Sequence, residues 1–276
     1  MKTNYLYNEN CLDTMSRMQN NYLDLTVTSP PYDNLRAYNG FDFDWKAIIK
    51  ELYRVTKEGG VVVWVVGDAT IKGSETGTSF KQALHAIDCG FNLHDTMIFL
   101  KNSSAFPSKT RYSQVFEYMF VFSKGKPKSI NLIKVLKSER TLKDQKQKAS
   151  NKIKEIKQRG VSGDEIVKRL KYNVETNYCV SKNVILYKNN FTNKKKGMQF
   201  KHPATFPEQL ANDHIMSWSN EGDLVYDPFM GSGTTAKMAI INKRKWIGSE
   251  MSSDYCDIIH ERLKQFDDDM FLNDKD

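Results

Sequence analysis

The chain has 276 residues, of which 39% are hydrophobic, and a formal net charge of +8 at pH 7. This length allows one large domain or a core domain with a smaller module, and the longest purely apolar run, Val61–Val66, excludes a spanning helix, which needs about 18 apolar residues. The N-terminus is too polar for a secretory signal and the four cysteines lie far apart, so we expect a soluble, cytoplasmic protein with reduced thiols and no metal site.

The first 124 residues alternate short apolar strands with amphipathic helical patterns. Gly59-Gly60 and Gly90 each stand where a helical pattern ends, which is typical of a helix C-terminus. This rhythm predicts an α/β sheet with helices on both faces, and we expect its last two strands to form an antiparallel hairpin at the edge. The expected strands cover residues 22–28, 61–66, 93–100 and 114–124, and the expected helices cover 44–58 and 79–89.

A basic segment interrupts this pattern. Residues 124–201 hold 22 Lys or Arg and 6 Asp or Glu, a net charge of +16, whereas the rest of the chain has a net charge of −8. Such a separation indicates a polyanion-binding module, with a lysine-rich solvated surface as the alternative. We expect a small, largely helical insert, because residues 131–172 are polar and lysine-rich and Ser162–Glu165 fits a capping box that opens a helix. The residues that follow are expected to form loops or a hairpin.

The α/β pattern resumes after residue 200. The chain is therefore predicted to divide into 1–124, 125–200 and 201–276, with the first and last parts sharing one sheet and the basic region between them. The expected helices of the last part cover residues 206–218, 234–244 and 252–266, the expected strands cover 222–227 and 245–250, and the acidic end of the chain is expected to fray.

The sequence DPFMGSGTT, Asp227–Thr235, lies between an expected strand and an expected helix. Gly231 and Gly233 allow a tight turn and a close approach to a ligand, and the helix that follows offers free N–H groups. Glu250 ends the next strand, where a carboxylate can accept both hydroxyls of a ribose. The loop is not a P-loop, because no Gly-Lys-Ser/Thr triplet occurs in the chain. A nicotinamide cofactor stays an alternative, although Ala236 replaces the usual third glycine and an aspartate before the loop suits an ammonium group better than a pyrophosphate.

A second loop follows the strand at 22–28. In Ser29-Pro30-Pro31-Tyr32 the prolines supply no N–H donor and leave their carbonyl oxygens free as acceptors. The Ser29 hydroxyl and the Pro30 carbonyl therefore suit an exocyclic NH₂ group, and Tyr32 can stack on the ring that carries it. Ligands of open α/β sheets bind beyond the carboxyl ends of the strands, so we expect the strands before the two loops to be neighbours.

Together these motifs resemble those of the beta-class DNA amino-methyltransferases, which use S-adenosylmethionine. TSPPY resembles their catalytic motif, DPFMGSGTT their cofactor loop, HPATFPEQL the segment before that loop, and WIGSEMSSDY their ribose-binding strand end. The catalytic motif precedes the cofactor loop, which is the beta-class order and a circular permutation of the usual methyltransferase sheet. The resemblance covers nearly all of the chain except residues 131–199, and it implies a Rossmann-like fold with the basic segment as the target-recognition region.

The resemblance also implies site residues. The family flips its target base out of the duplex, and Ser29, Pro30, Pro31 and Tyr32 would hold that base. Asp13 is alternatively an acid of an N-terminal helix, Phe206 stands where relatives often carry lysine, and the loop residues Arg36 and Tyr38 are alternatively a polar surface. The implied cofactor-binding residues are Asp227, Pro228, Phe229, Gly231, Ser232, Gly233, Thr234, Glu250, Asp13, His202, Pro203 and Phe206, and the implied DNA-binding residues are Arg36, Tyr38, Lys194, Lys195 and Lys196.

The sequence leaves alternatives for the target base and for the activity. In relatives, Ser-Pro-Pro-Tyr usually accompanies cytosine N4 and Asp-Pro-Pro-Tyr adenine N6, and a neutral hydroxyl can hydrogen-bond where a carboxylate would meet the acceptor N3 of cytosine. We therefore expect an N4-cytosine methyltransferase that acts on double-stranded DNA in a restriction-modification or phage setting, with a cognate endonuclease as a candidate partner. The alternatives are N6-adenine methylation, RNA or protein-amide methylation, and an inactive DNA-binding protein that retains the fold. For the oligomeric state, a monomer and a homodimer are both possible from the sequence.

Overall fold

The computed structural model describes residues 1–31, 43–101, 110–138, 154–159, 165–170, 178–187 and 207–266. The chain divides into two units. The first unit combines Met1–Asn131 with Asn183–Asp276, and the second unit is Leu132–Lys182.

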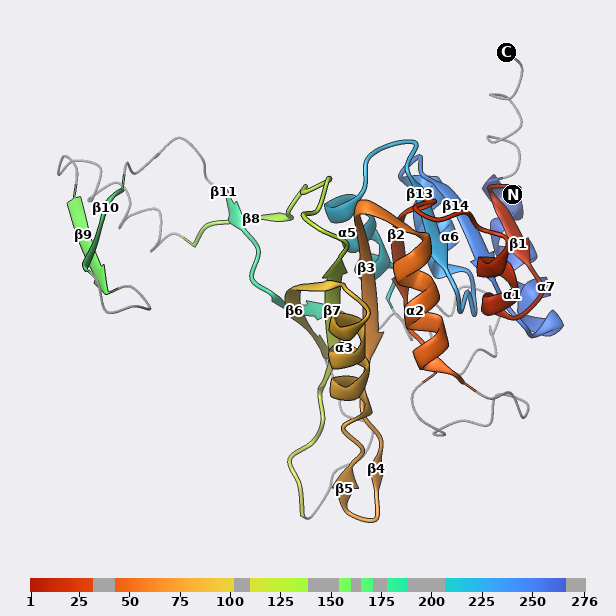
Figure 1. The fold of residues 1–276 in the computed structure, drawn as a ribbon, viewed down its shortest axis with the longest axis horizontal. Helices are drawn as coiled ribbons and strands as arrows, with labels where there is room; N and C mark the ends of the chain where they lie inside the picture. Colours follow the sequence, from red (N-terminus) through yellow and green to blue (C-terminus); the bar gives the residue numbers. More distant parts are fainter. Residues whose placement is uncertain are drawn as a thin grey trace. The chain divides into compact units, whose positions relative to one another are not determined.

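Eight strands of the first unit form one sheet, in the order β1-β14-β13-β2-β3-β7-β6-β12 (Figure 1). Neighbouring strands are parallel except in the two pairs that contain β7, so the predicted mostly parallel α/β sheet is confirmed. The strands are β1 (Tyr5–Tyr7), β2 (Leu23–Thr28), β3 (Thr56–Val66), β6 (Asn92–Lys101), β7 (Phe116–Ser123), β12 (Val184–Tyr187), β13 (Leu224–Asp227) and β14 (Lys245–Ser249). A short hairpin of β4 (Thr70–Ile71) and β5 (Ser74–Glu75) follows β3.

The predicted hairpin of β6 and β7 is present, but it does not lie at the edge of the sheet. Strand β12 pairs in parallel with β6 and forms the edge instead. This strand comes from the basic segment, where the sequence predicted loops or a hairpin. Its short apolar run forms a strand because Ile185 and Tyr187 pack into the main core beside β6. Strand β12 thus belongs to the first unit although it falls within the predicted 125–200 region.

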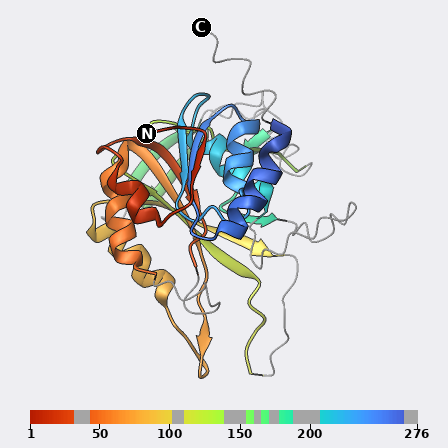
Figure 2. The same cartoon turned by 90° about the vertical axis from the view of Figure 1, so that its right-hand side faces the viewer.

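Helices cover both faces of the sheet, as predicted (Figures 1 and 2). On β3 the side chains alternate between the two faces, since Val63 belongs to one buried cluster and Trp64 to the other. The Trp64 face packs against α1 (Cys11–Ser16), α2 (Trp45–Val55) and α3 (Thr78–Asp88), and the Val63 face packs against α5 (Glu208–Trp218), α6 (Thr234–Ile241) and α7 (Ser253–Leu263), which continues into the 3₁₀ turn η2 (Lys264–Phe266).

Helix α2 ends at Val55, before the Gly59-Gly60 pair that was expected to close it. Thr56 is extended, with φ −72° and ψ 133°, and its hydroxyl donates a 2.6 Å hydrogen bond to the carbonyl oxygen of Leu52. The N–H of Thr56 donates to the same oxygen, so both polar groups of Thr56 hold the last turn of the helix. Strand β3 therefore begins at Thr56 and includes both glycines.

The second unit contains two antiparallel strand pairs and, among its described residues, no helix. Strand β8 (Lys134–Leu136) pairs with β11 (Tyr178–Val180), and β9 (Lys154–Arg159) pairs with β10 (Glu165–Leu170). The predicted largely helical insert is therefore wrong in this part, since the segment after the capping-box sequence is strand β10. A capping box is a local signal, whereas the β-branched Ile166 and Val167 favour a strand once β9 supplies a hydrogen-bonding partner.

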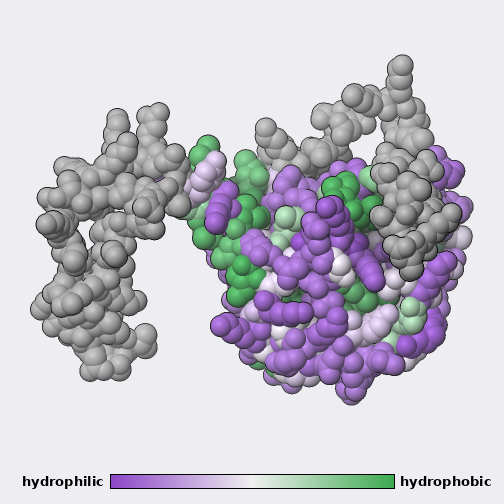
Figure 3. Space-filling view, turned by 90° about the horizontal axis from the view of Figure 1, so that it is seen from above, coloured by the Kyte–Doolittle hydropathy of each residue, from purple (hydrophilic) through white to green (hydrophobic). Residues whose placement is uncertain are grey.

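The described surface is mostly hydrophilic in the view of Figure 3, with apolar side chains gathered in a few patches. No described helix is long and apolar enough to span a membrane. Within the described ranges no three His, Cys, Asp or Glu side chains are grouped so that they could hold a metal ion, and all four cysteines are free thiols.

Candidate active site

The proline corner (Ser29–Pro31) and the glycine loop (Pro228–Gly233) follow neighbouring strands and meet at the carboxyl ends of these strands. Strands β2 and β13, which precede them, are parallel neighbours, as the sequence analysis expected. The hydroxyl of Thr28, the last residue of β2, donates a 2.7 Å hydrogen bond to Oδ1 of Asp227, the last residue of β13. Ser29 and Pro228 therefore both begin their loops at the carboxyl edge, where open α/β sheets bind their ligands.

The Asp227 carboxylate is 1% exposed and has three protein donors. Besides Thr28, the N–H of Phe229 donates to Oδ1 at 3.0 Å and the hydroxyl of Thr235 lies 2.8 Å from Oδ2. Burial raises the pKa of Asp227 to about 6, and these hydrogen bonds partly oppose the rise. The Thr235 hydroxyl also lies 3.1 Å from the carbonyl oxygen of Val27, so the start of α6 is bonded to both strands.

The proline corner begins inside the core. Thr28 is fully buried, Pro30 is buried, and Ser29 and Pro31 are partly buried. Because two consecutive prolines fix φ, this segment has few conformations to lose when a ligand binds. The predicted acceptor pair of Ser29 and Pro30 thus stands on a stiff and partly shielded backbone.

The Glu250 side chain fixes the glycine loop through backbone hydrogen bonds. Its Oε2 accepts a 2.9 Å hydrogen bond from the N–H of Gly231, and its Oε1 accepts a 2.9 Å hydrogen bond from the N–H of Ser252. Burial raises the pKa of Glu250. Gly231 and Gly233 have φ of 55° and 78°, in the left-handed region that favours glycine, and a Cβ at Gly233 would lie 3.2 Å from Ile259.

Arg262 of α7 fixes the same loop from the other side. Its Nη1 donates to the carbonyl oxygen of Ser232 at 2.7 Å and lies within 3.2 Å of the hydroxyls of Ser232 and Thr234. Its Nη2 forms a 2.6 Å ion pair with Glu208 at the start of α5, and Lys237 pairs with the same Glu208 oxygen at 2.7 Å. Although burial acts in the opposite direction, these bonds lower the pKa of Glu208. The glycine loop, α5, α6 and α7 are thereby tied together.

An aromatic cluster stands beside the glycine loop. The Phe229 ring meets the rings of Phe43 and Trp64 edge to face, with centroids 5.5 and 6.3 Å apart. The Trp64 indole N–H donates a 2.8 Å hydrogen bond to the Gln82 side chain of α3, which fixes the ring. The loop therefore has a rigid apolar wall on the α1–α3 side of the sheet.

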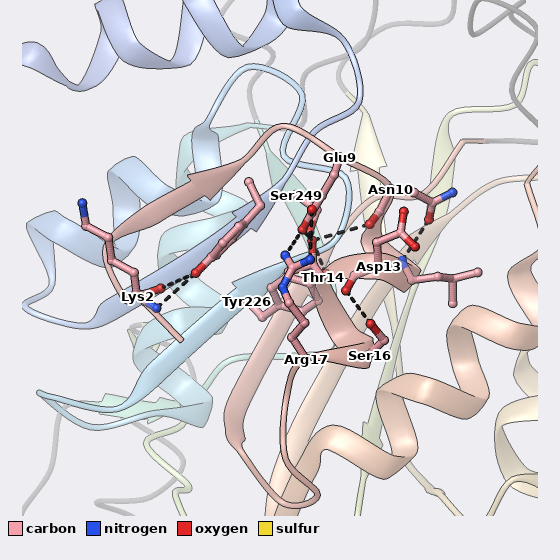
Figure 4. Close-up of polar contacts among 11 residues, drawn as sticks. Lys2, Glu9, Asn10, Asp13, Thr14, Ser16, Arg17, Tyr226 and Ser249 are labelled. Atoms are coloured by element: carbon pink, nitrogen blue, oxygen red, sulfur yellow. Dashed lines mark hydrogen bonds and ion pairs between the residues drawn. The ribbon is translucent and has the colours of Figure 1, made fainter.

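A chain of hydroxyls connects β13 and β14 to α1 (Figure 4). The Tyr226 hydroxyl lies 2.8 Å from that of Ser249, which donates to Thr14 at 2.9 Å, and Thr14 donates to Oε1 of Glu9 at 2.7 Å. Glu9 also forms an ion pair with Arg17. Burial raises the pKa of Tyr226 well above its usual value, so this phenol stays protonated. The network holds α1 against the strand end that carries Glu250.

Asp13 is exposed in the first turn of α1, where the helix dipole favours a carboxylate. This position agrees with the alternative of an N-terminal helix acid, and the contact of Asp13 with a cofactor stays a prediction. The predicted site residues Tyr32, Arg36, Tyr38, Lys194, Lys195, Lys196, His202, Pro203 and Phe206 lie outside the described residues.

The sequence analysis missed the residues that join the two loops. Thr28 was assigned only to a strand and Thr235 only to a helix, and neither Arg262 nor Glu208 was considered. Each of them carries a weak sequence signal, since a threonine at a strand end or an arginine in a helix is common. Their partners lie far away in the chain, so only the folded arrangement identifies them.

Comparisons with known proteins give the family and the fold of this chain. The family model of DNA methylases, which covers N6 and N4 methyltransferases, matches residues 23–261. The orphan methyltransferase M.BamHII of Bacillus amyloliquefaciens is 58% identical over 247 residues, which is 88% of this chain and 89% of that protein.

Two solved structures share the fold. The PvuII DNA methyltransferase, which is cytosine-N4-specific, superposes with a TM-score of 0.68 at 22% identity, over 95% of this chain and 87% of its own. The complex of M1.HpyAVI with SAM superposes with a TM-score of 0.56 at 20% identity, over 94% of this chain and 98% of its own. At these identities the likeness establishes the arrangement of the sheet and its helices.

Proposed function

The chain belongs to the DNA methylase family of N6 and N4 methyltransferases, and on this premise we propose that it methylates the N4 amino group of cytosine in double-stranded DNA with S-adenosylmethionine as donor. One observation carries this proposal. The Ser29-Pro30 corner and the glycine loop lie together at the carboxyl ends of β2 and β13, where Thr28 is hydrogen-bonded to Asp227. A donor held by one loop and an amino group held by the other would lie within reach of direct transfer.

The residues around the glycine loop fit S-adenosylmethionine. A carboxylate has about four acceptor sites, so Glu250 keeps two for ribose hydroxyls beside the N–H groups of Gly231 and Ser252. The glycines allow a close approach of the backbone, and Phe229 supplies an apolar wall. The buried Asp227 carboxylate favours a cationic ligand over a pyrophosphate. The bound cofactor would supply a methyl group on a positively charged sulfur.

The proline corner would activate the amino group. The exocyclic nitrogen is a weak nucleophile because its lone pair is delocalised into the base. Hydrogen bonds from its two N–H groups to the Ser29 hydroxyl and the Pro30 carbonyl would favour a pyramidal nitrogen whose lone pair points at the methyl group. Pro31 would keep the acceptors in place, and Tyr32 would stack on the base after it leaves the duplex. Catalysis would then rest on positioning and electrostatics.

Ser29 supports cytosine as the target. A hydroxyl can donate to the N3 acceptor of cytosine as well as accept from its amino group, whereas a carboxylate at this position could only accept. N6-adenine methylation is the alternative, and an inactive DNA-binding protein that retains the fold is the second one. The three groups proposed for turnover and cofactor binding, Ser29, Asp227 and Glu250, are all present, which favours an enzyme.

The basic segment supports DNA as the substrate. The net charge of +16 over residues 124–201 would neutralise backbone phosphates, with Lys194, Lys195 and Lys196 as proposed contacts and Arg36 and Tyr38 next to the flipped base. We expect affinity for DNA to fall steeply with salt, because phosphate contacts release counterions. A restriction-modification setting with a partner endonuclease is part of the proposal.

The modified nucleoside tests this function. The purified chain would be incubated with unmethylated DNA and labelled S-adenosylmethionine, and the digested nucleosides would be separated. We expect N4-methylcytosine, and we expect Ser29→Ala to bind the cofactor normally while turnover falls about 100-fold. Ser16→Ala, an exposed serine of α1, is the matched control. N6-methyladenine alone would refute the cytosine assignment, and cofactor binding without methylation of any DNA would favour the inactive DNA-binding protein.

A further inference from the structure

A short hairpin extends beyond the sheet at the end where the proposed reaction takes place. Strand β3 is the parallel neighbour of β2 and Thr28 is paired with Trp64, so the chain leaves the sheet after Val66, beside the proline corner. It forms the hairpin of β4 and β5, which extends away from the sheet in Figures 1 and 2. The hairpin therefore lies next to the place where the target base would be held.

The hairpin is fixed at its base. The N–H of Thr76 donates a 2.9 Å hydrogen bond to the carbonyl oxygen of Ala69, which closes the hairpin. The Asp68 carboxylate accepts a 2.8 Å hydrogen bond from the N–H of Ser79 and another from the Ser79 hydroxyl, so the hairpin is tied to the start of α3. A segment that is held in this way has little conformational freedom to lose when it binds a partner.

A second segment is bonded to the tip of the hairpin. Residues 110–115 lead into β7, the antiparallel neighbour of β3, so they join the sheet at the end where the hairpin leaves it. The Arg111 guanidinium donates a hydrogen bond to the carbonyl oxygen of Gly73 at the tip and lies 3.9 Å from the Glu75 carboxylate. Arg111 thereby holds the two segments together, and we call them the arm (residues 68–76 and 110–115).

The exposed side chains of the arm suit a nucleic acid. Tyr112 is 102% exposed, and a free aromatic ring can stack on a base. Lys72, in the turn of the hairpin, is exposed too, and Ile71 before it is 56% exposed. Residues 101–115 hold three Lys or Arg and no Asp or Glu, which favours a polyanion. Two exposed apolar side chains are too few for a stable protein interface, whereas one ring suffices to stack on a base.

The proposed reaction places the duplex at the arm. A flipped nucleotide stays attached to its neighbours through the backbone, so the duplex has to lie just outside the corner that holds the base. Because β3 is next to β2, the arm borders this space. Base flipping also leaves unstacked base faces beside the gap, which a protein side chain can cover.

We propose that the arm binds the duplex beside the flipped base, with Lys72 on a backbone phosphate and the Tyr112 ring stacked on a base next to the gap. Arg111 is a positioning residue, because it holds the segment that carries Tyr112 against the hairpin tip. The inference rests on the proposed function and deepens it, since it assigns part of the DNA binding to residues outside the basic segment. Phosphate contacts and stacking tolerate any base, so the arm adds affinity without reading the sequence.

The salt dependence of DNA binding tests the phosphate contact. The purified full chain would be titrated with a fluorescent DNA duplex at several salt concentrations. Each phosphate contact adds about 0.9 to the slope of log affinity against log salt, so we expect Lys72→Ala to reduce the slope by about 0.9. Lys243→Ala is the matched control, because Lys243 is also an exposed lysine with positive φ but precedes β14, at the opposite end of the sheet. An unchanged slope in Lys72→Ala would overturn the phosphate contact.

Methylation kinetics test the stacked ring. We expect Tyr112→Ala to raise the KM for unmethylated genomic DNA about tenfold and to leave the KM for S-adenosylmethionine unchanged, which shows that the variant is folded. Tyr112→Phe keeps the ring and should behave like the wild type. Tyr5→Ala is the control, since Tyr5 is an exposed tyrosine (38%) on the edge strand β1. A wild-type KM for DNA in Tyr112→Ala, or an equal loss in Tyr112→Phe, would overturn the stacking.

Failure of the arm differs from failure of the proposed function. A wild type that methylates DNA, with Lys72 and Tyr112 variants that match it, would refute the arm alone. A wild type that binds the duplex but transfers no methyl group would refute the proposed function, and the salt slope of Lys72→Ala would still decide the phosphate contact. A wild type that binds no duplex at any salt concentration would overturn both.

Discussion

Thr28 and Asp227 are 199 residues apart in the chain and share a 2.7 Å hydrogen bond between the ends of neighbouring strands. The bond connects the last residue before the proline corner with the last residue before the glycine loop. Any relative movement of the two loops would stretch this bond. It therefore keeps the proposed binding site of the target amino group at a fixed distance from the proposed cofactor site. Loss of this bond should therefore disturb the alignment of the two loops on which the proposed methyl transfer depends.

The first prediction concerns the Thr28 hydroxyl. Thr28→Val keeps the shape of the side chain and removes one of the three donors to the buried Asp227, so we expect the free energy of unfolding to fall by about 1.5–3 kcal/mol. Urea denaturation measures the change. Thr26→Val, two residues earlier in β2, is the matched control, because the Thr26 hydroxyl is buried without a hydrogen-bond partner. Equal losses in the two variants would contradict a special role of Thr28.

The second prediction is a pH dependence of stability. Burial raises the pKa of Asp227 to about 6, whereas an unfolded aspartate titrates near 3.9. The folded state therefore holds the proton more tightly, and the resulting stability is fully present below about pH 4 and is lost as the pH rises through 6. A shift of about 2 pKa units corresponds to about 3 kcal/mol.

The variant Asp227→Asn isolates this contribution, since it does not titrate. We expect the free energy of unfolding of the wild type, relative to that of the variant, to decrease by about 2 kcal/mol between pH 4 and 6.5 and then to level off. Denaturation series at several pH values measure the difference. A difference that stays constant over this range would show that Asp227 titrates normally in the folded protein.

The parallel core was predictable because its signals are local and repeated. The run Val61–Val66 and the amphipathic helix after Asp44 each reveal their structure within about ten residues. Strand β12 was missed because four residues, Val184–Tyr187, become a strand only beside β6. Strand β10 was predicted as a helix for the same reason. It forms a strand by pairing with β9, and residues 165–170 alone do not indicate this pairing. Helix α3 was predicted correctly, but its spacing does not tell which of its sides faces the sheet.

The candidate site divides in the same way. Ser29, Asp227, Gly231, Gly233 and Glu250 lie in short motifs whose residue types are unusual together, so the sequence alone predicts them as candidate site residues. The residues that hold these motifs in place are ordinary ones, and their partners are remote in the chain. Only the pairing of β2 with β13 and the packing of α7 against the glycine loop bring them together.

The third prediction concerns Glu250. Glu250→Gln leaves one acceptor oxygen for two backbone N–H groups, those of Gly231 and Ser252, and it also removes acceptors for the ribose. A hydrogen bond to a charged acceptor contributes about 1.5–3 kcal/mol, so losing the ribose contact is expected to raise the dissociation constant of S-adenosylmethionine about 10- to 100-fold in calorimetric titrations. Glu261→Gln changes an exposed carboxylate of α7 and should bind the cofactor normally. If both variants keep wild-type affinity, Glu250 has no part in the cofactor site.

The last prediction concerns Arg262, which we expect to act by positioning the glycine loop. Arg262→Ala frees the Ser232 carbonyl and breaks the connection to Glu208, and we expect the KM for S-adenosylmethionine to rise about tenfold while kcat changes much less. Arg262→Lys should recover part of the loss, because lysine keeps the charge but cannot bond the loop and Glu208 with one planar fork. Lys264→Ala removes an exposed ion pair with Glu261 near the same helix end and should leave KM unchanged. A merely structural arginine would lower thermal stability without separating KM from kcat, so parallel losses in both parameters, or no recovery by lysine, would refute the positioning role.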